Sequence, residues 1–366
     1  MKDYFRDKSI LVTGVCGTVG SELADQLLGN PEYSIRELIG IDNNESALFL
    51  LDQKYLEEER ARFFLSDIRD ADSLGQRFEG VDLVFHCAAL KHVILSEHSP
   101  EQAVLSNIVG VQNVIAASQQ HGVEKVIFTS SDKAVNPTNV MGTSKLMGER
   151  LMTAANNSKR KRDTVFASTR FGNVLGSNGS VIPIFHNQIA KGGPLTLTDE
   201  QMSRFVMSIE ESVQLVINSA SLAHGGEVLI TKMPVVRICD LAKAMIAELA
   251  PVYGFSEEDI RIDIIGSKPG EKMYEELMSS EETRRAVEMT NYFSILPAFR
   301  GMYHDIEYSY PDMNPDEVTD PYISSEQTPL TVREIRTLLK EYDLLSLPSE
   351  SISKRYWPGD KEENQH

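Results

Sequence analysis

The chain has 366 residues, of which 41% are hydrophobic and 25% charged, a composition typical of globular rather than disordered proteins. Its formal net charge of −18 excludes a general electrostatic attraction to nucleic acids or anionic membranes. No run reaches the ~18 apolar residues that span a bilayer, and the charged residues 1–9 have no signal-peptide pattern. We therefore expect a soluble, cytoplasmic protein that binds neither nucleic acid nor membrane.

The three cysteines, Cys16, Cys87 and Cys239, lie far apart and match no metal-binding spacing. Cys16 and Cys87 fall in apolar, strand-linked segments. We expect buried free thiols and no metal site.

Apolar runs rich in Val, Ile and Phe alternate with helix-patterned stretches as far as about Arg170, which is typical of βαβ units. The expected strands are Ser9–Thr13, Glu37–Asp42, Arg62–Ser66, Leu83–Cys87, Lys125–Ser130 and Val165–Arg170. The expected helices between them are Ser21–Leu28, Pro100–His121 and Asn139–Asn156. This order predicts an α/β fold with a Rossmann-type doubly wound parallel sheet.

Glycines and prolines become frequent after Arg170 and indicate loops and short elements. We expect helices at 210–223, 238–249 and 331–342, the last opened by a capping box of Thr331 and Glu334, and a strand at 227–231. The predicted division is an NAD-binding domain (1–172, with later sheet elements from about 205–231), an interleaved substrate-binding lobe (173–330) and a C-terminal helix and tail (331–366). We expect solvated or frayed segments at 159–162 and 359–366.

A glycine-rich loop follows the first expected strand and opens the first helix. Gly14 permits the tight turn, Gly17 lets the backbone approach a pyrophosphate, and Gly20 lets the helix pack on the strand. The predicted cofactor contacts in this loop are Thr13, Gly14, Gly17, Thr18, Val19 and Gly20. A simple turn is the alternative, but the strand before and the helix after favour a dinucleotide.

An acidic residue stands where a dinucleotide site needs one. Asp42 ends the second strand, where a carboxylate bonds the adenosine ribose and repels a 2′-phosphate, so NAD is favoured over NADP. Asp67 follows the third strand and is expected at the adenine edge. Ile68, after the third strand, and Ala88, after the fourth, are expected to contact the cofactor.

The loop pattern Thr-Gly-x-x-Gly-x-x-Gly resembles the short-chain dehydrogenase/reductase superfamily. In that superfamily a Tyr-x-x-x-Lys pair holds the ribose and moves the hydroxyl proton. Lys145 matches the lysine, but Met141 stands at the tyrosine position, and no tyrosine occurs between Tyr55 and Tyr253. Either the chain binds NAD without turnover, or Ser131, Asp132 and Lys133 at the end of the fifth strand carry out the proton transfers in place of the tyrosine.

The stretch Ser-Asp-Lys-Ala-Val-Asn-Pro-x-Asn-x-Met-Gly-x-x-Lys at 131–145 is similar to the UDP-N-acetylglucosamine 4,6-dehydratases, in the branch with Met for Tyr. The similarity continues at 170–183, 202–205 and 268–272, and so covers roughly 10–297. Ser131 replaces the usual threonine of the triplet. The resemblance implies C4 oxidation by NAD, loss of water across C5 and C6, and hydride return to C6.

The resemblance also implies roles. Asp132 would protonate the leaving C6 hydroxyl, Lys133 would be the base at C5, Ser131 would bond the C4 oxygen and Lys145 would hold the ribose. Which group takes the C4 hydroxyl proton stays open, with Asp132 as the hypothesis. The expected substrate contacts are Lys91, His92, Met141, Asn173, Ser180, Val181, Arg204 and Glu271.

Two alternatives remain at this point: a UDP-sugar 4-epimerase, and a non-catalytic regulator that binds NAD or a UDP-sugar. The pair Asp132–Lys133 and the missing tyrosine favour the dehydratase. For His92 a packing role is the alternative, and for Arg204 a surface ion pair. The resemblance to the superfamily implies a homo-oligomer that associates through the helices expected at 100–121 and 139–156. Retention or inversion at C5, the exact hexose and the pathway stay open.

Overall fold

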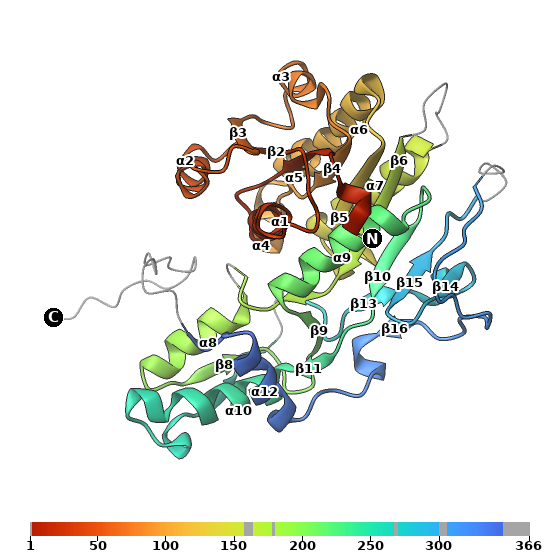
Figure 1. Ribbon diagram of the computed structural model, residues 1–366. Coiled ribbons are helices and arrows are strands. Elements are labelled where there is room, and N and C mark those ends of the chain that lie inside the picture. The colour runs from red at the N-terminus through yellow and green to blue at the C-terminus, as the bar shows by residue number, and fades with distance from the viewer. Residues whose placement is uncertain (1, 157–163, 178–179, 267–269, 300–305, 347–366) are drawn as a thin grey trace.

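A computed structural model describes residues 2–156, 164–177, 180–266, 270–299 and 306–346 (Figure 1). The predicted segments at 159–162 and 359–366 lie outside these residues. Its largest feature is a nine-stranded sheet in the order β14-β15-β10-β6-β5-β4-β1-β2-β3. The strands are β1 Ser9–Thr13, β2 Glu37–Asp42, β3 Ala61–Leu65, β4 Leu83–His86, β5 Lys125–Ser131, β6 Val165–Phe171, β10 Val228–Thr231, β14 Ala286–Glu288 and β15 Tyr292–Ile295.

The strands from β3 to β10 are parallel, so their carboxyl ends meet at one edge of the sheet. The order 3-2-1-4-5-6 reverses direction at β1, which is where doubly wound sheets bind ligands. Every residue of β1 is buried, as expected for a strand covered on both faces. The predicted doubly wound parallel sheet is confirmed.

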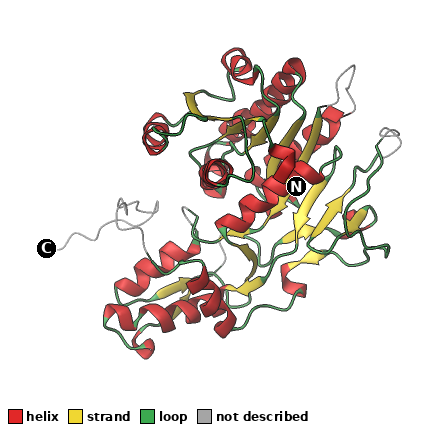
Figure 2. Ribbon diagram, viewed as in Figure 1, coloured by secondary structure: helices red, strands yellow, loops and turns green. Residues whose placement is uncertain are grey.

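Two helical layers cover the faces. Ile10 and Val12 of β1 join the core under α1 and α9, whereas Leu11 joins the core under α6 and α7. The helices are α1 Thr18–Gly29, α2 Glu45–Lys54, α3 Ala71–Gly75, α4 Val93–His98, α5 Pro100–Val104, α6 Gly110–His121, α7 Val140–Ala155 and α9 Ile209–Leu222. In Figure 2 the strands run between these helices.

A smaller lobe follows β6 and contains α8, α10 and α12 (Figure 1). Its core is separate and is built from side chains such as Phe185, Leu241 and Leu339. The predicted capping box of Thr331 and Glu334 opens α12. The elements are α8 Val181–Ala190, α10 Ile238–Leu249, α11 Ser280–Thr283, α12 Val332–Glu341, β7 Asn173–Val174, β8 Leu195–Leu197, β9 Ser203–Met207, β11 Val235–Arg237, β12 Ile262–Ile264, β13 Glu276–Met278 and β16 Tyr322–Ile323.

Two details differ from the sequence-based expectation. The helix expected at 100–121 is interrupted by a π-helical turn, η3 (Leu105–Val109), where the Gly110 N–H donates to the Leu105 carbonyl five residues back. The antiparallel strands β15 and β14 extend the large sheet, although they come from the segment expected in the smaller lobe. The division of the chain into domains stays a prediction. No helix in the described part of the chain is long and apolar enough to cross a membrane.

Candidate active site

The glycine loop fits the backbone arrangement of a dinucleotide site. Gly14 has φ +69°, and a Cβ there would lie 2.6 Å from the Ala88 backbone nitrogen. A Cβ on Gly20 would lie 2.3 Å from the Gly14 carbonyl oxygen. Gly17 precedes α1 and makes no side-chain cap, so the first N–H groups of that helix can receive a phosphate.

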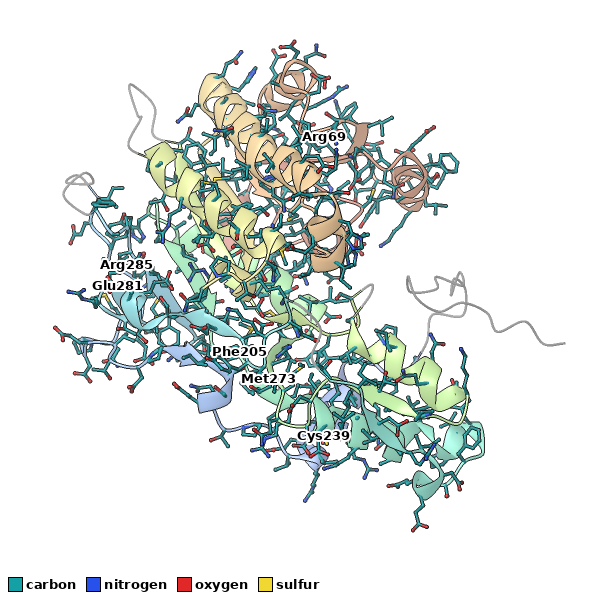
Figure 3. All side chains as sticks on the ribbon, turned by 180° about the vertical axis from the view of Figure 1, so that it is seen from behind. Arg69, Phe205, Cys239, Met273, Glu281 and Arg285 are labelled. Atoms are coloured by element: carbon teal, nitrogen blue, oxygen red, sulfur yellow. The ribbon has the colours of Figure 1, made fainter. Side chains whose placement is uncertain are left out.

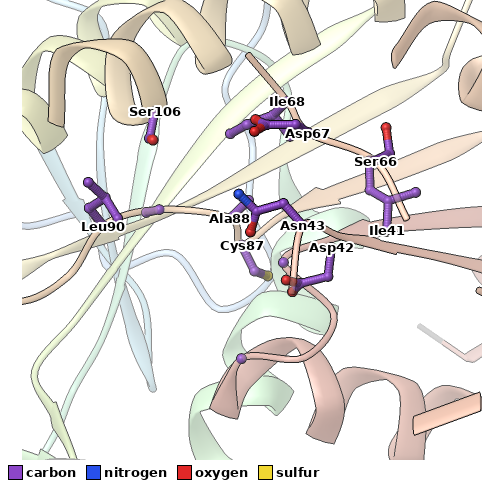
Figure 4. A pocket seen from close by; sticks show the side chains of 13 residues that line it. Ile41, Asp42, Asn43, Ser66, Asp67, Ile68, Cys87, Ala88, Leu90 and Ser106 are labelled. Carbon is purple, nitrogen blue, oxygen red and sulfur yellow. The ribbon is translucent and has the colours of Figure 1, made fainter. Parts of the chain in front are cut away.

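A pocket opens above this loop between the ends of β1, β2 and β4. Its lining includes Gly14, Gly17, Asp42, Asp67, Ile68 and Ala88 of the predicted cofactor contacts (Figure 4). The Asp42 carboxylate accepts hydrogen bonds from the Cys16 and Asn44 backbone N–H groups, each at 3.0 Å, and is therefore held at the pocket wall. Asp67 pairs with Arg69, whose hydrogen bonds lower the pKa of that carboxyl.

Thr13 is fully buried and acts on the pocket through its neighbours. Its hydroxyl lies 2.6 Å from His86 Nδ1 and accepts a hydrogen bond from the Ala88 N–H at 3.3 Å. Burial, together with Lys145, lowers the pKa of His86 to about 3, so this imidazole is neutral near pH 7. The Cys16 and Cys87 thiols are half-buried rather than buried, and burial raises the pKa of each to about 12.

Asn107 lies in the π-helical turn and links two parts of the site. Its amide donates to the Leu90 carbonyl at 3.0 Å and to the Ser144 hydroxyl at 2.9 Å, and its oxygen accepts the Leu90 N–H at 2.8 Å. The loop after β4 is thereby fixed to α7.

Lys145 lies on α7 at the end of β5. Its ammonium donates to the Thr129 carbonyl at 2.8 Å and lies 4.7 Å from the centre of the Phe128 ring. Burial lowers the pKa of Lys145 to about 8. Asn139 caps α7 by accepting the Gly142 N–H at 2.8 Å, which places the buried Met141 in the first turn.

A cluster of charges lies at the carboxyl end of β5. The Asp132 carboxylate, 1% exposed, accepts from the Ser131 hydroxyl at 2.5 Å, from the Lys133 backbone N–H at 2.9 Å and from the Lys133 ammonium at 3.1 Å. All three bonds reach Oδ1. Among the described residues, no hydrogen-bond partner reaches Asp132 Oδ2. The structure thus brings the predicted triplet Ser131, Asp132 and Lys133 together with one carboxylate oxygen unused.

A second buried carboxylate, Glu275, completes the cluster. Its Oε1 lies 3.5 Å from the Lys133 ammonium and 3.7 Å from Arg204 Nε. Burial and the neighbouring Asp132 raise the pKa of Glu275. Burial lowers the pKa of Lys133, but Asp132 and Glu275 outweigh it, so the net shift is upward and the amine is an ammonium at rest.

Arg204 is buried and largely committed to the protein. Its guanidinium donates to the carbonyls of Ser203 at 2.8 Å, Lys272 at 2.7 Å and Met273 at 3.2 Å. Arg204 Nη2 also lies 3.9 Å from Glu271 Oε1, and the other oxygen of Glu271 accepts a hydrogen bond from the Thr198 hydroxyl. The surface ion pair considered for Arg204 is wrong, because the side chain is only 7% exposed.

The segment 272–276 packs on the turn that follows Asp132 and Lys133. The Lys272 ammonium donates to the Val135 carbonyl at 2.9 Å, and the Asn136 amide donates to Glu276 at 2.7 Å. Asn136 holds a left-handed φ of +43°, and the bond to Glu276 fixes its side chain there. Met273, labelled in Figure 3, lies between the large sheet and the smaller lobe.

The other predicted contacts lie on separate elements. Lys91 and His92 are exposed before α4, Asn173 is in β7, and Ser180 and Val181 begin α8. Their substrate roles stay predictions, as do the roles of Thr18 and Val19 in the first turn of α1.

Sequence reasoning missed Glu275. It follows the quoted motif by three residues, and residues 268–269 of that motif lie outside the described part of the chain. The available signal was a pair of adjacent acids, Glu275 and Glu276, directly before the apolar Leu277. In the described residues no group of three or more His, Cys, Asp or Glu side chains is placed to hold a metal ion.

The family described as "Polysaccharide biosynthesis protein" matches residues 10–297. An uncharacterized membrane protein of Methanocaldococcus jannaschii is 50% identical over 81% of this chain and 88% of its own length. A UDP-N-acetylglucosamine 4,6-dehydratase (inverting) of Campylobacter jejuni is 38% identical over 83% of this chain and 87% of its own. A UDP-glucose 4-epimerase of Rickettsia bellii is 36% identical over 93% of this chain and 97% of its own length.

The X-ray structure of Pen from Bacillus thuringiensis superposes with a TM-score of 0.85 at 40% identity, covering 94% of this chain and 100% of that one. This similarity spans both the large sheet and the smaller lobe, because nearly all of each chain is included. With the glycine loop and Lys145 in place, the chain belongs to the polysaccharide biosynthesis protein family, within the extended short-chain dehydrogenases/reductases.

Proposed function

We propose that the protein is an NAD-dependent dehydratase that converts UDP-N-acetylglucosamine to a UDP-4-keto-6-deoxy-N-acetylhexosamine. The observation that carries the proposal is the pair Asp132–Lys133 at the carboxyl end of β5, with Asp132 Oδ2 buried and unpartnered among the described residues. An acid and a base side by side are what the elimination of water requires.

The pocket residues suit NAD. The Gly14–Gly17 turn and the start of α1 would hold the pyrophosphate, Asp42 the adenosine ribose, and Asp67 and Ile68 the adenine. Bound NAD supplies the acceptor and donor of hydride. Lys145, whose pKa of about 8 leaves it mostly protonated near pH 7, would hold the nicotinamide ribose.

The catalytic roles are proposed from the resemblance, and the contacts of Ser131, Asp132 and Lys133 support them. Asp132 takes the C4 hydroxyl proton, relayed through the Ser131 hydroxyl that already donates to it, and later gives a proton to the leaving C6 hydroxyl. These two transfers leave Asp132 unchanged over one turnover. Lys133 removes the C5 proton and returns one to C5 at the end. Met141 cannot titrate and would contribute apolar packing at the sugar.

The UDP end of the substrate is assigned by the resemblance. Asn173, Ser180, Val181 and Glu271 are proposed to contact UDP, and Lys91 and His92 the sugar. Arg204 is proposed to act there too, although three of its donors already bond carbonyls. We propose that the main role of Arg204 is to position the segment 272–275.

A 4-epimerase is the second candidate, favoured by the similarity to the Rickettsia bellii UDP-glucose 4-epimerase. An epimerase needs no acid for a leaving C6 hydroxyl, so Asp132 and Lys133 favour the dehydratase. A non-catalytic regulator would keep the NAD pocket but has no use for this buried charge cluster.

The test is incubation of the purified protein with UDP-N-acetylglucosamine in D₂O, followed by proton NMR and mass spectrometry. Loss of one water with a new 6-methyl signal is the expected result, and the C5 coupling gives retention or inversion. Epimerisation at C4 without loss of water would establish the epimerase. An unchanged substrate, with other UDP- and dTDP-hexoses also unchanged, would favour the regulator.

We also propose a cytoplasmic homo-oligomer. Val104, Leu105 and Met147 are 40–45% exposed on the helices expected to associate, which supports burial against a second copy. Size-exclusion chromatography with light scattering tests this proposal, and a strict monomer would overturn it.

A further inference from the structure

We infer that Glu275 accepts the ammonium proton of Lys133 and so frees the amine to act as the base at C5. The inference rests on the proposed dehydratase function. It answers a problem that the cluster poses, because a base must be unprotonated and Lys133 is held as an ammonium by two carboxylates.

The division of proton transfers selects Glu275 over Asp132 for this role, although the Lys133 ammonium lies nearer to Asp132 Oδ1, at 3.1 Å. Oδ1 of Asp132 already accepts three hydrogen bonds, and the proposed mechanism uses Asp132 for the C4 and C6 oxygens. Glu275 Oε1 lies 3.5 Å from the Lys133 ammonium. No hydrogen-bond partner reaches its Oε2 in the described part of the chain. The Glu275 side chain is 4% exposed against 26% for Lys133, so it lies deeper and away from solvent.

The charges around Glu275 permit the transfer. It is faced by Asp132 and Lys133 from the turn η4 (Asp132–Ala134), by Arg204 from β9 and by Lys272 from the preceding loop. Passing a proton from Lys133 to Glu275 leaves the net charge of the cluster unchanged. Glu275 is already shielded from water, and a sugar that covers Lys133 removes the water that remains there, which disfavours the two charged forms and favours the neutral pair.

The step balances. The Lys133 ammonium and the Glu275 carboxylate become an amine and a carboxylic acid. The amine takes the C5 proton, the C5–H electron pair forms the C5–C6 double bond, and the C6 hydroxyl leaves as water with the proton from Asp132. After hydride has returned to C6, the Lys133 ammonium protonates C5, and Glu275 returns its proton to the amine. No other reactant is needed.

Glu275→Gln keeps the shape of the side chain but cannot take the proton. Lys133 must then lose its proton to solvent, because Asp132 is committed to the C4 and C6 oxygens. We expect kcat near neutral pH to fall about 100-fold and to recover about tenfold per pH unit as alkali deprotonates Lys133, with KM unchanged. The wild type should have a level profile over the same range. Product methyl signal and C5 deuterium incorporation from D₂O are measured together on UDP-N-acetylglucosamine.

Glu276→Gln is the matched control. Glu276 is the adjacent buried carboxylate and bonds Asn136 and Lys272, but not Lys133. We expect it to lower stability without alkaline recovery. Glu275→Asp keeps the carboxyl, so its kcat should be lower but should stay level with pH as in the wild type. This variant provides the test if Glu275→Gln does not fold.

Three outcomes would overturn the inference: a Glu275→Gln profile parallel to that of the wild type, alkaline recovery in Glu276→Gln as well, or alkaline recovery in Glu275→Asp equal to that of the glutamine variant. A wild type that leaves the substrate unchanged would instead overturn the proposed function.

Discussion

The two ends of the site are built in different ways. The cofactor end consists mainly of backbone: a left-handed Gly14, a Gly20 packed on the Gly14 carbonyl, and N–H groups that fix Asp42. The catalytic end consists of charged side chains from distant segments, Asp132 and Lys133, Arg204, and Glu275.

This difference separates two kinds of sensitivity. At the cofactor end a substitution acts through shape, because an added Cβ meets backbone atoms that cannot move aside. At the catalytic end a substitution that keeps the shape still changes the charge balance. We therefore expect isosteric variants to be mild at the first end, and severe at the second where they remove a charge.

The largest expected effect is that of Lys133→Met at the catalytic end. The variant keeps an unbranched chain of similar length but removes the proposed base, so dehydration should fall by about 10³-fold or more. The 6-methyl NMR signal measures this. Binding of UDP-N-acetylglucosamine, followed by calorimetry, is the control and should change little. A variant with near wild-type turnover would remove Lys133 from the mechanism.

A second buried charge cluster provides a structural comparison. Arg170 donates to Glu149 at 2.8 and 2.6 Å, to Glu282 at 2.9 Å twice, and to the Leu277 carbonyl at 3.1 Å. The Ser130 hydroxyl also donates to Glu149 at 2.6 Å. Here all five guanidinium N–H groups donate hydrogen bonds. The cluster of Asp132, Lys133 and Glu275, by contrast, leaves one oxygen of Asp132 and one of Glu275 unpartnered among the described residues.

Arg170→Met should therefore damage the fold rather than the chemistry. It leaves Glu149 and Glu282 buried without their cation, which costs about 3–5 kcal/mol of the free energy of unfolding. Urea denaturation measures the loss. Lys232→Met, which breaks the partly exposed pair with Glu288, is the control and should cost less than about 1 kcal/mol. Equal losses for the two variants would contradict this account.

The same cluster predicts an acid dependence of stability. Burial alone would raise the pKa of Glu282, but Arg170 lowers it to about 2. A carboxyl pKa that folding depresses stabilises the fold above the unfolded value of about 4.3. That contribution, about 3 kcal/mol, is lost as pH falls toward 2. Urea midpoints from neutral to acidic pH should fall more steeply in the wild type than in Glu282→Gln, and parallel curves would contradict the assignment.

The same difference explains how much of each end could be predicted from the sequence. The glycine loop, Asp42, and the triplet Ser131–Lys133 are local patterns, and their places at strand ends follow from the parallel sheet. Glu275 reaches Lys133 through the packing of a distant loop, which no local pattern encodes. The π-helical turn at Asn107 escaped prediction because it is a single five-residue turn within a helical pattern and is too short to set a period of its own. The strands β14 and β15 were missed because they are short.

Asp42→Ala tests the cofactor end. Losing this carboxylate removes the proposed ribose partner, so NAD affinity should weaken about tenfold, whereas NADP, which the carboxylate would repel, should weaken less or improve. Fluorescence titration with both dinucleotides gives the ratio. Asp67→Ala is the matched control from the same pocket, because its carboxylate pairs with Arg69, and it should weaken both dinucleotides alike. An unchanged NAD to NADP ratio in Asp42→Ala would contradict the specificity role.

The smallest expected effect is that of Met141→Leu, which tests whether the catalytic end works by charge alone. Met141 is 3% exposed in the first turn of α7, and its thioether has no proton to move in the accessible pH range. Leucine conserves the volume, so stability should fall by less than about 1.5 kcal/mol and kcat by no more than about threefold. If turnover fell a hundredfold while the fold and NAD binding were retained, the sulfur would have to take part in catalysis. Asp132 and Lys133 would then not account for all of the catalytic steps.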